Sequence, residues 1–322
     1  MKSSKNITQV MTYRPDIDGL RAVSVLGVVL FHAGAPVTGG FAGVDVFFVI
    51  SGYLITGILI REMGENRFSI VRFWERRIRR ILPVLFCVTL VTLIAGALLM
   101  LPFGFQVVGQ SSVAVFLMAS NIQFYRTTGY FDPSAEENPL LHTWSLSVEE
   151  QFYLVLPLLL LLVFRLRMQR NLGPMIWLVI AGSLGISVFW LARDSAMSFY
   201  LLPSRAWELA VGSLLAARMP SEAGKGVKFW GGWAGLALIV ATFFVYTPET
   251  PFPGFAAMVP VAGAALVIWA GVGSGHRHGV GRWLSCRPLV AVGLASYSFY
   301  LWHWPFFAFH RYITSNSPSA GV

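Results

Sequence analysis

Long apolar runs alternate with short polar or basic loops along the chain. Nine apolar runs are interpreted as membrane-spanning helices, at about 20–34, 41–60, 81–101, 141–164, 174–192, 199–217, 229–246, 252–272 and 288–309, and the first of them is short for a span. A helix needs roughly 20 residues to cross a hydrocarbon core of about 30 Å. A tenth run at 107–120 is shorter and interrupted, so a full span and a re-entrant piece are both open for it. The pattern predicts an all-α polytopic transmembrane bundle of about ten spans.

The loops between these runs differ in charge. The loop over 61–80 carries seven arginines against three glutamates, and further basic loops lie at 165–170, 218–228 and 276–287. Loops rich in lysine and arginine stay on the cytoplasmic side of a membrane, and these loops can all do so only if 107–120 does not cross. The expected organisation is a cytoplasmic polar N-terminus at 1–19, a transmembrane domain at 20–312 and a polar tail at 313–322.

The composition supports an integral membrane protein. Of the 322 residues, 56% are hydrophobic and 12% are charged, whereas about a quarter of a soluble domain is charged. The net charge of +9 comes largely from the basic loops, so it indicates topology and not a nucleic-acid partner. The first apolar run is interpreted as a retained first span and not as a cleaved signal, so it is expected to stay in the membrane. Cys87 and Cys286 show no pairing or metal motif, and no metal site is expected.

The first span carries a cation at one end and a titratable ring at the other. Arg21 and His32 are separated by ten residues, almost all apolar. Eleven helical steps of about 100° and 1.5 Å place both on one face, roughly 16 Å apart. Arg21 alone is best explained as an interfacial anchor, and Asp16 and Asp18 before it are placed to cap the helix. His32 lies inside the span, where a neutral imidazole can take a proton from a hydroxyl, so it is a candidate general base.

The basic loop ends in the stretch FWERRIRRILP. Its arginines, Arg76, Arg77, Arg79 and Arg80, offer dense bidentate donors that suit a phosphate-rich nucleotide arriving from the cytoplasm. Cytoplasmic loops of membrane proteins are commonly basic, however, and topology alone also explains this cluster.

Two adjacent carboxylates stand in HTWSLSVEEQFY, about one turn into a helix that then becomes apolar. These are Glu149 and Glu150. If Ser145 or Ser147 caps this helix, one glutamate is its capping partner. The other is then a candidate to orient an imidazole or to counter an arginine, because an unpaired charge inside a membrane is costly.

Other polar residues also fall within apolar spans. Arg205 and Glu208 lie three residues apart in SRAWELAVG, where a self-neutralised structural pair and a functional pair are equally good interpretations. The second span adds Asp45, Ser51 and Tyr53 to the polar core candidates. The last span, rich in tyrosine and tryptophan, reads as an interfacial aromatic belt, and its His303 is expected to be structural.

Six of these stretches follow one another as they do in the acyltransferase-3 family of membrane proteins. They are YRPDIDGLRAVSVLGVVLFHAG, GFAGVDVFFVISGYLI, FWERRIRRILP, HTWSLSVEEQFY, SRAWELAVG and SYSFYLWHWP. The chain therefore resembles that family over almost its whole length. The family's R-x10-H spacing is met by Arg21 and His32, and its R-x-R by Arg77 and Arg79.

The resemblance implies an O-acyltransferase of the bacterial inner membrane with a cytoplasmic N-terminus. Such an enzyme moves an acetyl group from cytoplasmic acetyl-CoA to a hydroxyl of a cell-envelope glycan, such as O-antigen, another lipopolysaccharide sugar or peptidoglycan. Acetyl-CoA is a substrate here, and no permanently bound cofactor is expected. In this scheme His32 is the general base or a transient acyl carrier. Arg21, Arg77 and Arg79 hold the CoA phosphates, and Glu149 or Glu150 orients a polar partner.

Two questions stay open at this stage. The sequence is most similar to the O-antigen-type branch, whose members continue into a periplasmic SGNH-hydrolase-like domain, so the chain is either a fragment or works without that domain attached. The competing function is a transporter or flippase of lipid-linked glycan without covalent chemistry, because intramembrane charges would also line a transport path. A binding or scaffold module of the cell envelope is a third alternative.

Overall fold

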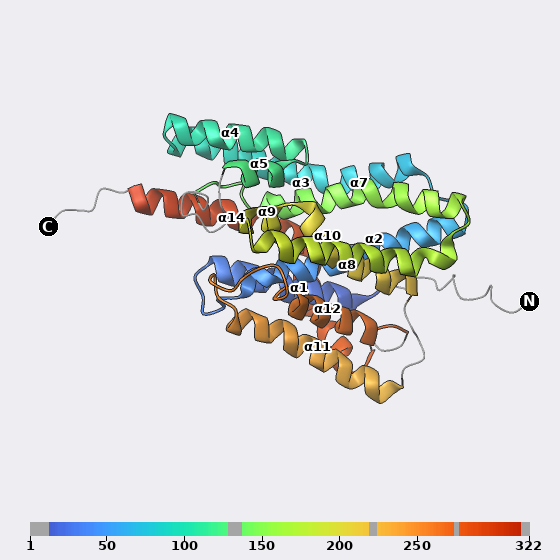
Figure 1. Cartoon of the computed structure of the whole chain (residues 1–322). Helices are drawn as coiled ribbons and strands as arrows, with labels where there is room; N and C mark the ends of the chain where they lie inside the picture. The colour runs from blue at the N-terminus through green and yellow to red at the C-terminus, as the bar shows by residue number, and fades with distance from the viewer. Residues whose placement is uncertain (1–12, 128–136, 219–223, 274–276, 317–322) are drawn as a thin grey trace, which may run out of the picture.

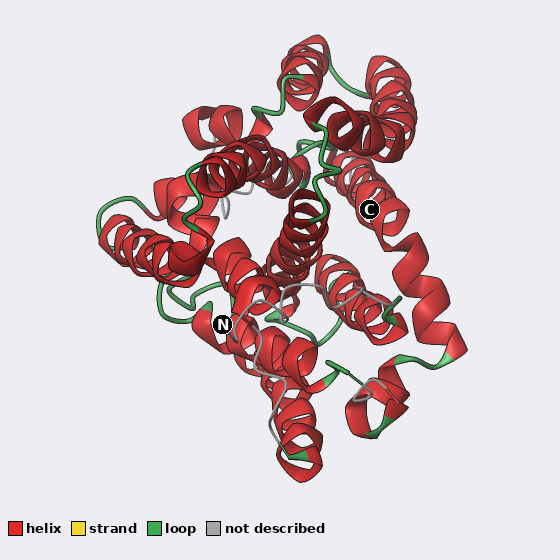
Figure 2. Cartoon of the chain, turned by 90° about the vertical axis from the view of Figure 1, so that its right-hand side faces the viewer, coloured by secondary structure: helices red, strands yellow, loops and turns green. Residues whose placement is uncertain are grey.

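The computed structural model describes residues 13–127, 137–218, 224–273 and 277–316, and every regular element in them is a helix (Figure 2). The helices are α1 (Pro15–His32), η1 (Gly40–Ala42), α2 (Gly43–Gly64), α3 (Ile70–Leu99), α4 (Pro102–Phe116), α5 (Ser120–Thr127), α7 (Thr143–Arg165), η2 (Gln169–Asn171), α8 (Leu172–Leu191), α9 (Ser195–Tyr200), α10 (Leu202–Arg218), α11 (Lys225–Val245), α12 (Met258–Ala270), α13 (Gly279–Leu284) and α14 (Arg287–Asn316). The all-α prediction is confirmed. The expectations for the outermost N-terminal and tail residues, and for parts of the loops near 128–136, 219–223 and 274–276, lie outside the described residues.

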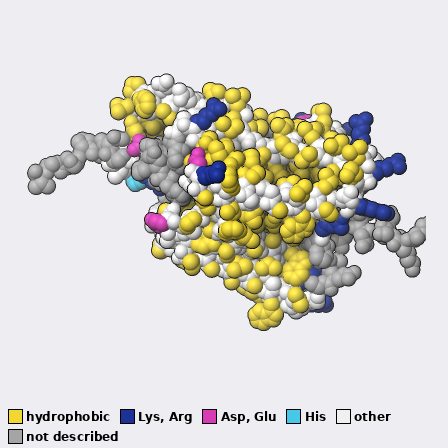
Figure 3. Space-filling view, viewed as in Figure 1, with side chains coloured by type: hydrophobic (Ala, Val, Ile, Leu, Met, Phe, Trp, Pro, Cys, Tyr) yellow, Lys and Arg dark blue, Asp and Glu magenta, His cyan; other side chains and the backbone are white. Residues whose placement is uncertain are grey.

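The helices suit a membrane. Five helical stretches of the described chain are long and apolar enough to cross one: Gly40–Gly64, Ile70–Leu99, Thr143–Arg165, Gln169–Leu191 and Lys225–Val245. Hydrophobic side chains cover most of the face drawn in Figure 3. The chain is therefore a multi-pass membrane protein. The other predicted spans fall on helices that are shorter or carry more polar residues, namely α1, α10, α12 and α14, so the count of about ten stays a prediction.

The central helices pack in pairs. α10 lies between α2 and α8, α1 packs along α14, and α11 packs along α12. In the view of Figure 1, α3, α4 and α7 form an upper layer, α11 and α12 a lower layer, and α1, α2 and α10 lie between them. Segments far apart in the sequence therefore meet in the middle of the bundle.

Two glycines bring α2 and α10 into backbone contact. A Cβ atom on Gly52 would lie 1.9 Å from the carbonyl oxygen of Leu209, and one on Gly212 would lie 2.0 Å from that of Val49. Any larger residue would push the helices apart, because real Cβ atoms do not approach backbone atoms so closely. This contact sets the distance between the charged residues that the two helices carry.

α1 begins at Pro15, five residues before the predicted start of the first span. Proline suits the first turn of a helix because the amide hydrogen it lacks would have no helical partner there. The expectation that Asp16 and Asp18 cap this helix is wrong, since no side-chain cap bond forms. Asp16 instead accepts two hydrogen bonds from Arg14, at 2.8 and 2.6 Å, and Asp18 lies 3.5 Å from Arg21.

The run at 107–120, whose crossing the sequence left open, lies on α4 and the turn before α5. α4 has 15 residues, so it is about 22 Å long. That is shorter than a hydrocarbon core of about 30 Å. The short length of α4 favours the re-entrant alternative.

Candidate functional site

A cavity of about 330 Å³ lies between α1, α2, α3, α7 and α14. Cavities of this size hold small-molecule ligands. Its polar lining comes from five helices and consists of Arg21, Ser51, Arg77, Arg80, Ser145, Glu149, Glu150, Tyr153, Ser296, Tyr297 and Tyr300. Five of the ten arginine and carboxylate candidates that the sequence singled out therefore meet around one space.

Three of the five candidate donor-binding arginines line this cavity, namely Arg21, Arg77 and Arg80. The guanidinium of Arg77 lies 5.5 Å from the ring centroid of Tyr153, which holds it at the wall. The other two arginines face outward. The side chain of Arg76 is 50% exposed and pairs with Glu62, and that of Arg79 is 78% exposed and pairs with Glu75.

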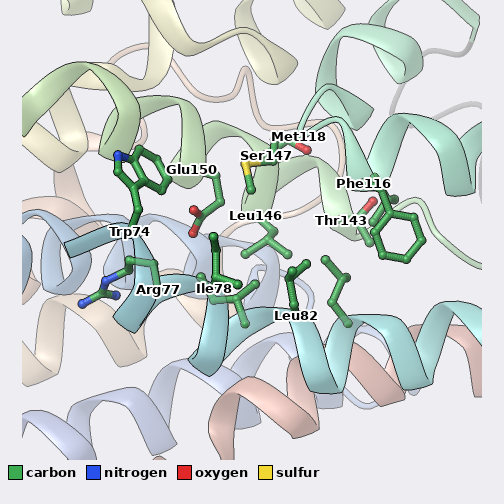
Figure 4. A pocket seen from close by; sticks show the side chains of 13 residues that line it. Trp74, Arg77, Ile78, Leu82, Phe116, Met118, Thr143, Leu146, Ser147 and Glu150 are labelled. Atoms are coloured by element: carbon green, nitrogen blue, oxygen red, sulfur yellow. The ribbon is translucent and has the colours of Figure 1, made fainter. Parts of the chain in front are cut away.

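The two adjacent glutamates have different surroundings. Glu149 accepts hydrogen bonds from the hydroxyls of Ser51 at 2.9 Å and Tyr153 at 3.3 Å. Glu150 is buried, and its Oε1 atom has no hydrogen-bond partner within the described residues. A smaller, mostly apolar pocket between α3, α4 and α7 shares Arg77 and Glu150 with the cavity, and Figure 4 shows the Glu150 carboxylate directed from α7 towards α3.

Neither serine caps α7, which begins at Thr143 without a side-chain cap bond. The Ser145 hydroxyl lies 2.6 Å from that of Tyr300, and the Ser147 hydroxyl lies 2.7 Å from that of Ser120. A structural role as capping partner therefore does not account for either glutamate.

His32 turns into the bundle at the end of α1. Its Nδ1 atom lies 3.0 Å from Nε2 of His303 on α14, and the two ring planes are nearly parallel, with centroids 5.2 Å apart. The edge of Trp304 contacts its other side, with centroids 4.6 Å apart. His32 is not among the residues that line the large cavity. Tyr300, which does line it, has its ring centroid 5.5 Å from that of His303 and thus connects the cavity to the histidines.

A third imidazole completes this cluster. His142, just before α7, has its ring centroid 5.7 Å from that of His303 and 5.6 Å from that of Tyr300. Its two ring nitrogens are buried and hydrogen bond to no described residue. The sequence interpretation passed over His142 and took His303 as structural. The sequence signal that could have pointed to His142 and His303 is a histidine inside an apolar stretch, the same signal that singled out His32.

Arg205 lies at the centre of a second charged group, fully buried between α2 and α10. Its Nη1 atom is 3.2 Å from Asp45 and 2.9 Å from Glu208, and all three side chains have no exposed surface. Four aromatic rings surround the guanidinium, those of Phe48, Trp144, Phe199 and Phe252, with centroids 5.4–5.6 Å away. This group lies outside the cavity, so Asp45, Arg205 and Glu208 are not brought to the candidate site.

Tyr53 also lies away from the cavity. Its hydroxyl is 3.5 Å from Nη1 of Arg14, which binds Asp16 as well. Among the described residues, no group of three or more histidine, cysteine or carboxylate side chains is arranged to hold a metal ion. Cys87 and Cys286 are free and exposed. The polar groups placed for chemistry are the arginines and glutamates of the cavity and the hydrogen-bonded pair of His32 and His303.

Comparison with known proteins places this arrangement in a family. The model of the acyltransferase domain of the acyltransferase-3 family matches residues 14–320. O-acetyltransferase OatA of Staphylococcus aureus is 34% identical over 313 residues, which cover 92% of this chain and 51% of that protein. The putative peptidoglycan O-acetyltransferase YrhL of Bacillus subtilis is 33% identical, over 92% of this chain and 49% of its own length.

The chain thus spans about half the length of the curated relatives it matches. No solved structure matches it. The family match covers all the helices described above, including those that carry the cavity and the histidine cluster. The chain belongs to the acyltransferase-3 family of membrane proteins.

Proposed function

We propose that this protein transfers an acetyl group from cytoplasmic acetyl-CoA to a hydroxyl of a cell-envelope glycan. The observation that carries the proposal is the cavity itself, with Arg21, Arg77 and Arg80 in its wall and Tyr300 linking it to His32 and His303. Membership of the acyltransferase-3 family and two relatives named as O-acetyltransferases support it.

The arginines of the cavity explain how the acetyl-CoA donor is bound. Coenzyme A carries several phosphate groups, and guanidinium groups bind phosphate through paired, charge-assisted hydrogen bonds. Arg77 and Arg80 lie three residues apart on α3 and share one face, and Arg21 of α1 lines the same cavity. With the phosphates held there, the pantetheine arm extends along the cavity towards Tyr300.

His32 supplies the base. Its imidazole takes the proton from the acceptor hydroxyl while the hydroxyl oxygen attacks the thioester carbonyl. The new carbon–oxygen bond forms, the carbon–sulfur bond breaks, and the proton passes to the leaving thiolate, so the products are an acetyl ester and free coenzyme A. Acyl transfer through His32 itself gives the same products in two steps and is the alternative within this scheme.

For the acceptor we propose peptidoglycan-type sugar, since one relative is named for peptidoglycan O-acetylation. O-antigen and other lipopolysaccharide sugars stay predictions from the sequence. The relatives are about twice as long as this chain. Cooperation with a further SGNH-type domain, attached or separate, is therefore part of the proposal.

Labelled acetyl-CoA tests the proposal directly. Inverted membrane vesicles containing the protein should incorporate label into cell-envelope glycan as an alkali-labile ester. The His32→Ala variant should lose at least 100-fold of this activity while remaining in the membrane at normal abundance, because general acid–base catalysis contributes about 10²–10⁴-fold. Vesicles that move lipid-linked glycan but never transfer label would instead identify the transporter.

A further inference from the structure

We propose that His303 is a positioning residue that holds the ring proton of His32 on Nδ1, so that Nε2 of His32 is the basic atom. The inference rests on the proposed function, because it assigns a role within acetyl transfer. It also changes the interpretation of His303, which the sequence alone presented as part of an aromatic belt.

The backbone of α14 sets the tautomer of His303. Nδ1 of His303 lies 2.6 Å from the carbonyl oxygen of Tyr300, one helical turn earlier. A carbonyl oxygen can only accept a hydrogen bond. Nδ1 of His303 must therefore carry the proton and donate it, which leaves Nε2 of the neutral ring as an acceptor.

The proton on Nδ1 of His303 in turn determines where His32 carries its proton. Nε2 of His303 lies 3.0 Å from Nδ1 of His32. Since the His303 nitrogen accepts, the His32 nitrogen must be the donor and must carry its proton there. The lone pair of His32 is then on Nε2, which hydrogen bonds to no described residue. The hydrogen bond at Nδ1 of His32 thus makes Nε2 of the same ring the basic atom.

The surrounding contacts hold His32 in this orientation. The His32 and His303 rings are nearly parallel, with an interplanar angle of 26°. Trp304 packs edge-on against His32, and its indole nitrogen donates to the carbonyl oxygen of Asn138 at 2.7 Å. Arg311 donates to the backbone carbonyl of His32 at 3.0 Å. Contacts from α14 therefore hold both the ring of His32, through His303 and Trp304, and its backbone, through Arg311.

His142 offers a control within the same cluster. Its ring contacts both His303 and Tyr300, yet neither of its nitrogens hydrogen bonds to a described residue. The backbone carbonyl of His142 accepts a hydrogen bond from the Tyr300 hydroxyl at 3.0 Å, and a substitution of the side chain leaves that carbonyl in place. His142→Phe therefore removes a buried imidazole without breaking the chain of ring hydrogen bonds.

The test compares three variants by kinetics. His303→Phe keeps the ring and removes both nitrogens, and it should lower kcat for acetyl transfer at least 100-fold while KM for acetyl-CoA changes less than twofold. His303→Gln should restore activity at least tenfold over His303→Phe, because its amide oxygen can accept from His32 while the chain remains similar in length. His142→Phe should stay within threefold of the unsubstituted protein. Equal losses in His303→Phe and His142→Phe, or no recovery in His303→Gln, would overturn the inference.

A second measurement does not depend on activity. Solid-state ¹⁵N NMR of histidine-labelled protein in bilayers distinguishes a protonated ring nitrogen from an unprotonated one. The His32 signal, identified by its loss in His32→Gln, should show the proton on Nδ1, and His303→Phe should give a mixture of tautomers. A proton on Nε2 in the unsubstituted protein would overturn the inference. If the unsubstituted protein transfers no acetyl label, the proposed function fails, while this measurement still decides the orientation of His32.

Discussion

Neighbouring arginines on α3 differ in what they can bind. Arg77 lines the cavity and stacks near Tyr153, whereas Arg79 is largely exposed and pairs with Glu75. A hydrogen bond to a charged group contributes about 1.5–3 kcal/mol, and an exposed salt bridge contributes about 0–1 kcal/mol. The side chain that faces the cavity should therefore dominate donor binding.

We expect Arg77→Ala to raise the Kd for acetyl-CoA by at least tenfold, and Arg79→Ala to change it by less than threefold. Isothermal titration of the purified protein in lipid nanodiscs measures both values. The two variants remove the same group from positions two residues apart, so Arg79→Ala is the matched control. Equal effects would mean that the phosphates bind at the outer surface of the loop and not in the cavity.

The residues of the site were partly predictable from the sequence. Arg21, Arg77 and Glu149 were named and do line one cavity. Arg77 and Arg79 were taken together as a motif, although two helical steps of about 100° place them on different faces. The pairing of His32 with His303 joins residues 271 positions apart, and no local pattern encodes such a contact.

At the scale of helices, the buried group of Arg205, Asp45 and Glu208 joins α2 to α10. One guanidinium faces two carboxylates with no water-exposed surface. Removing one partner from a buried ionic group costs about 3–5 kcal/mol, because it leaves an uncompensated charge. Removal of the Arg205 cation leaves two carboxylates without a positive partner, whereas removal of one carboxylate leaves Arg205 paired with the other.

Arg205→Met should therefore destabilise the protein more than Asp45→Asn does. Thermal melts in detergent give the melting temperatures of the two variants. The quantity monitored is the fraction of protein that remains monodisperse. The triple variant Arg205→Met, Asp45→Asn, Glu208→Gln should recover part of the loss, since it leaves no charge in the group. If Arg205→Met melts at or above the temperature of Asp45→Asn, the group does not stabilise the fold through charge.

The glycine contact between the same helices gives a separate prediction. Gly212→Ala would place a Cβ atom 2.0 Å from a backbone oxygen of α2, so the helices must separate. Overpacking of this kind costs about 1–3 kcal/mol, and the melting temperature should fall. Gly182→Ala on α8 is the control, because a Cβ atom there meets nothing within 4 Å. A Gly212→Ala melt equal to that of Gly182→Ala would show that the helices are not in backbone contact.

The locations of the helices could be predicted from the sequence better than the residues at which they begin and end. Each of the nine apolar runs falls on a helix, and five of these helices are long and apolar enough to cross a membrane. Helix ends depend on particular contacts, as α1 shows by starting at Pro15 with Asp16 bound to Arg14. The segment at 107–120 was ambiguous for the same reason, since its short helix is defined by packing on α3.

For the whole molecule, the distribution of charge predicts how the bundle is oriented in the membrane. Arginine and lysine side chains gather at the right-hand end in Figure 3, the end where the loop between α2 and α3 lies. The loop after α1 lies at the other end of α2, where the Thr38 hydroxyl donates to the carbonyl oxygen of Tyr246 after α11. α2 has 22 residues and is about 33 Å long, so the two loops are a membrane thickness apart.

A labelling experiment tests this orientation. In a background with Cys87 and Cys286 replaced by serine, since both are exposed, one variant carries Arg67→Cys in the loop after α2 and another carries Glu249→Cys in the loop after α11. Because basic loops stay in the cytoplasm, a membrane-impermeant maleimide should label Glu249→Cys in intact cells and Arg67→Cys only in inverted vesicles. The reverse result would place the arginine-lined cavity away from cytoplasmic acetyl-CoA and contradict the proposed route of the donor. Labelling of both variants from one side would contradict the arrangement of the helices themselves.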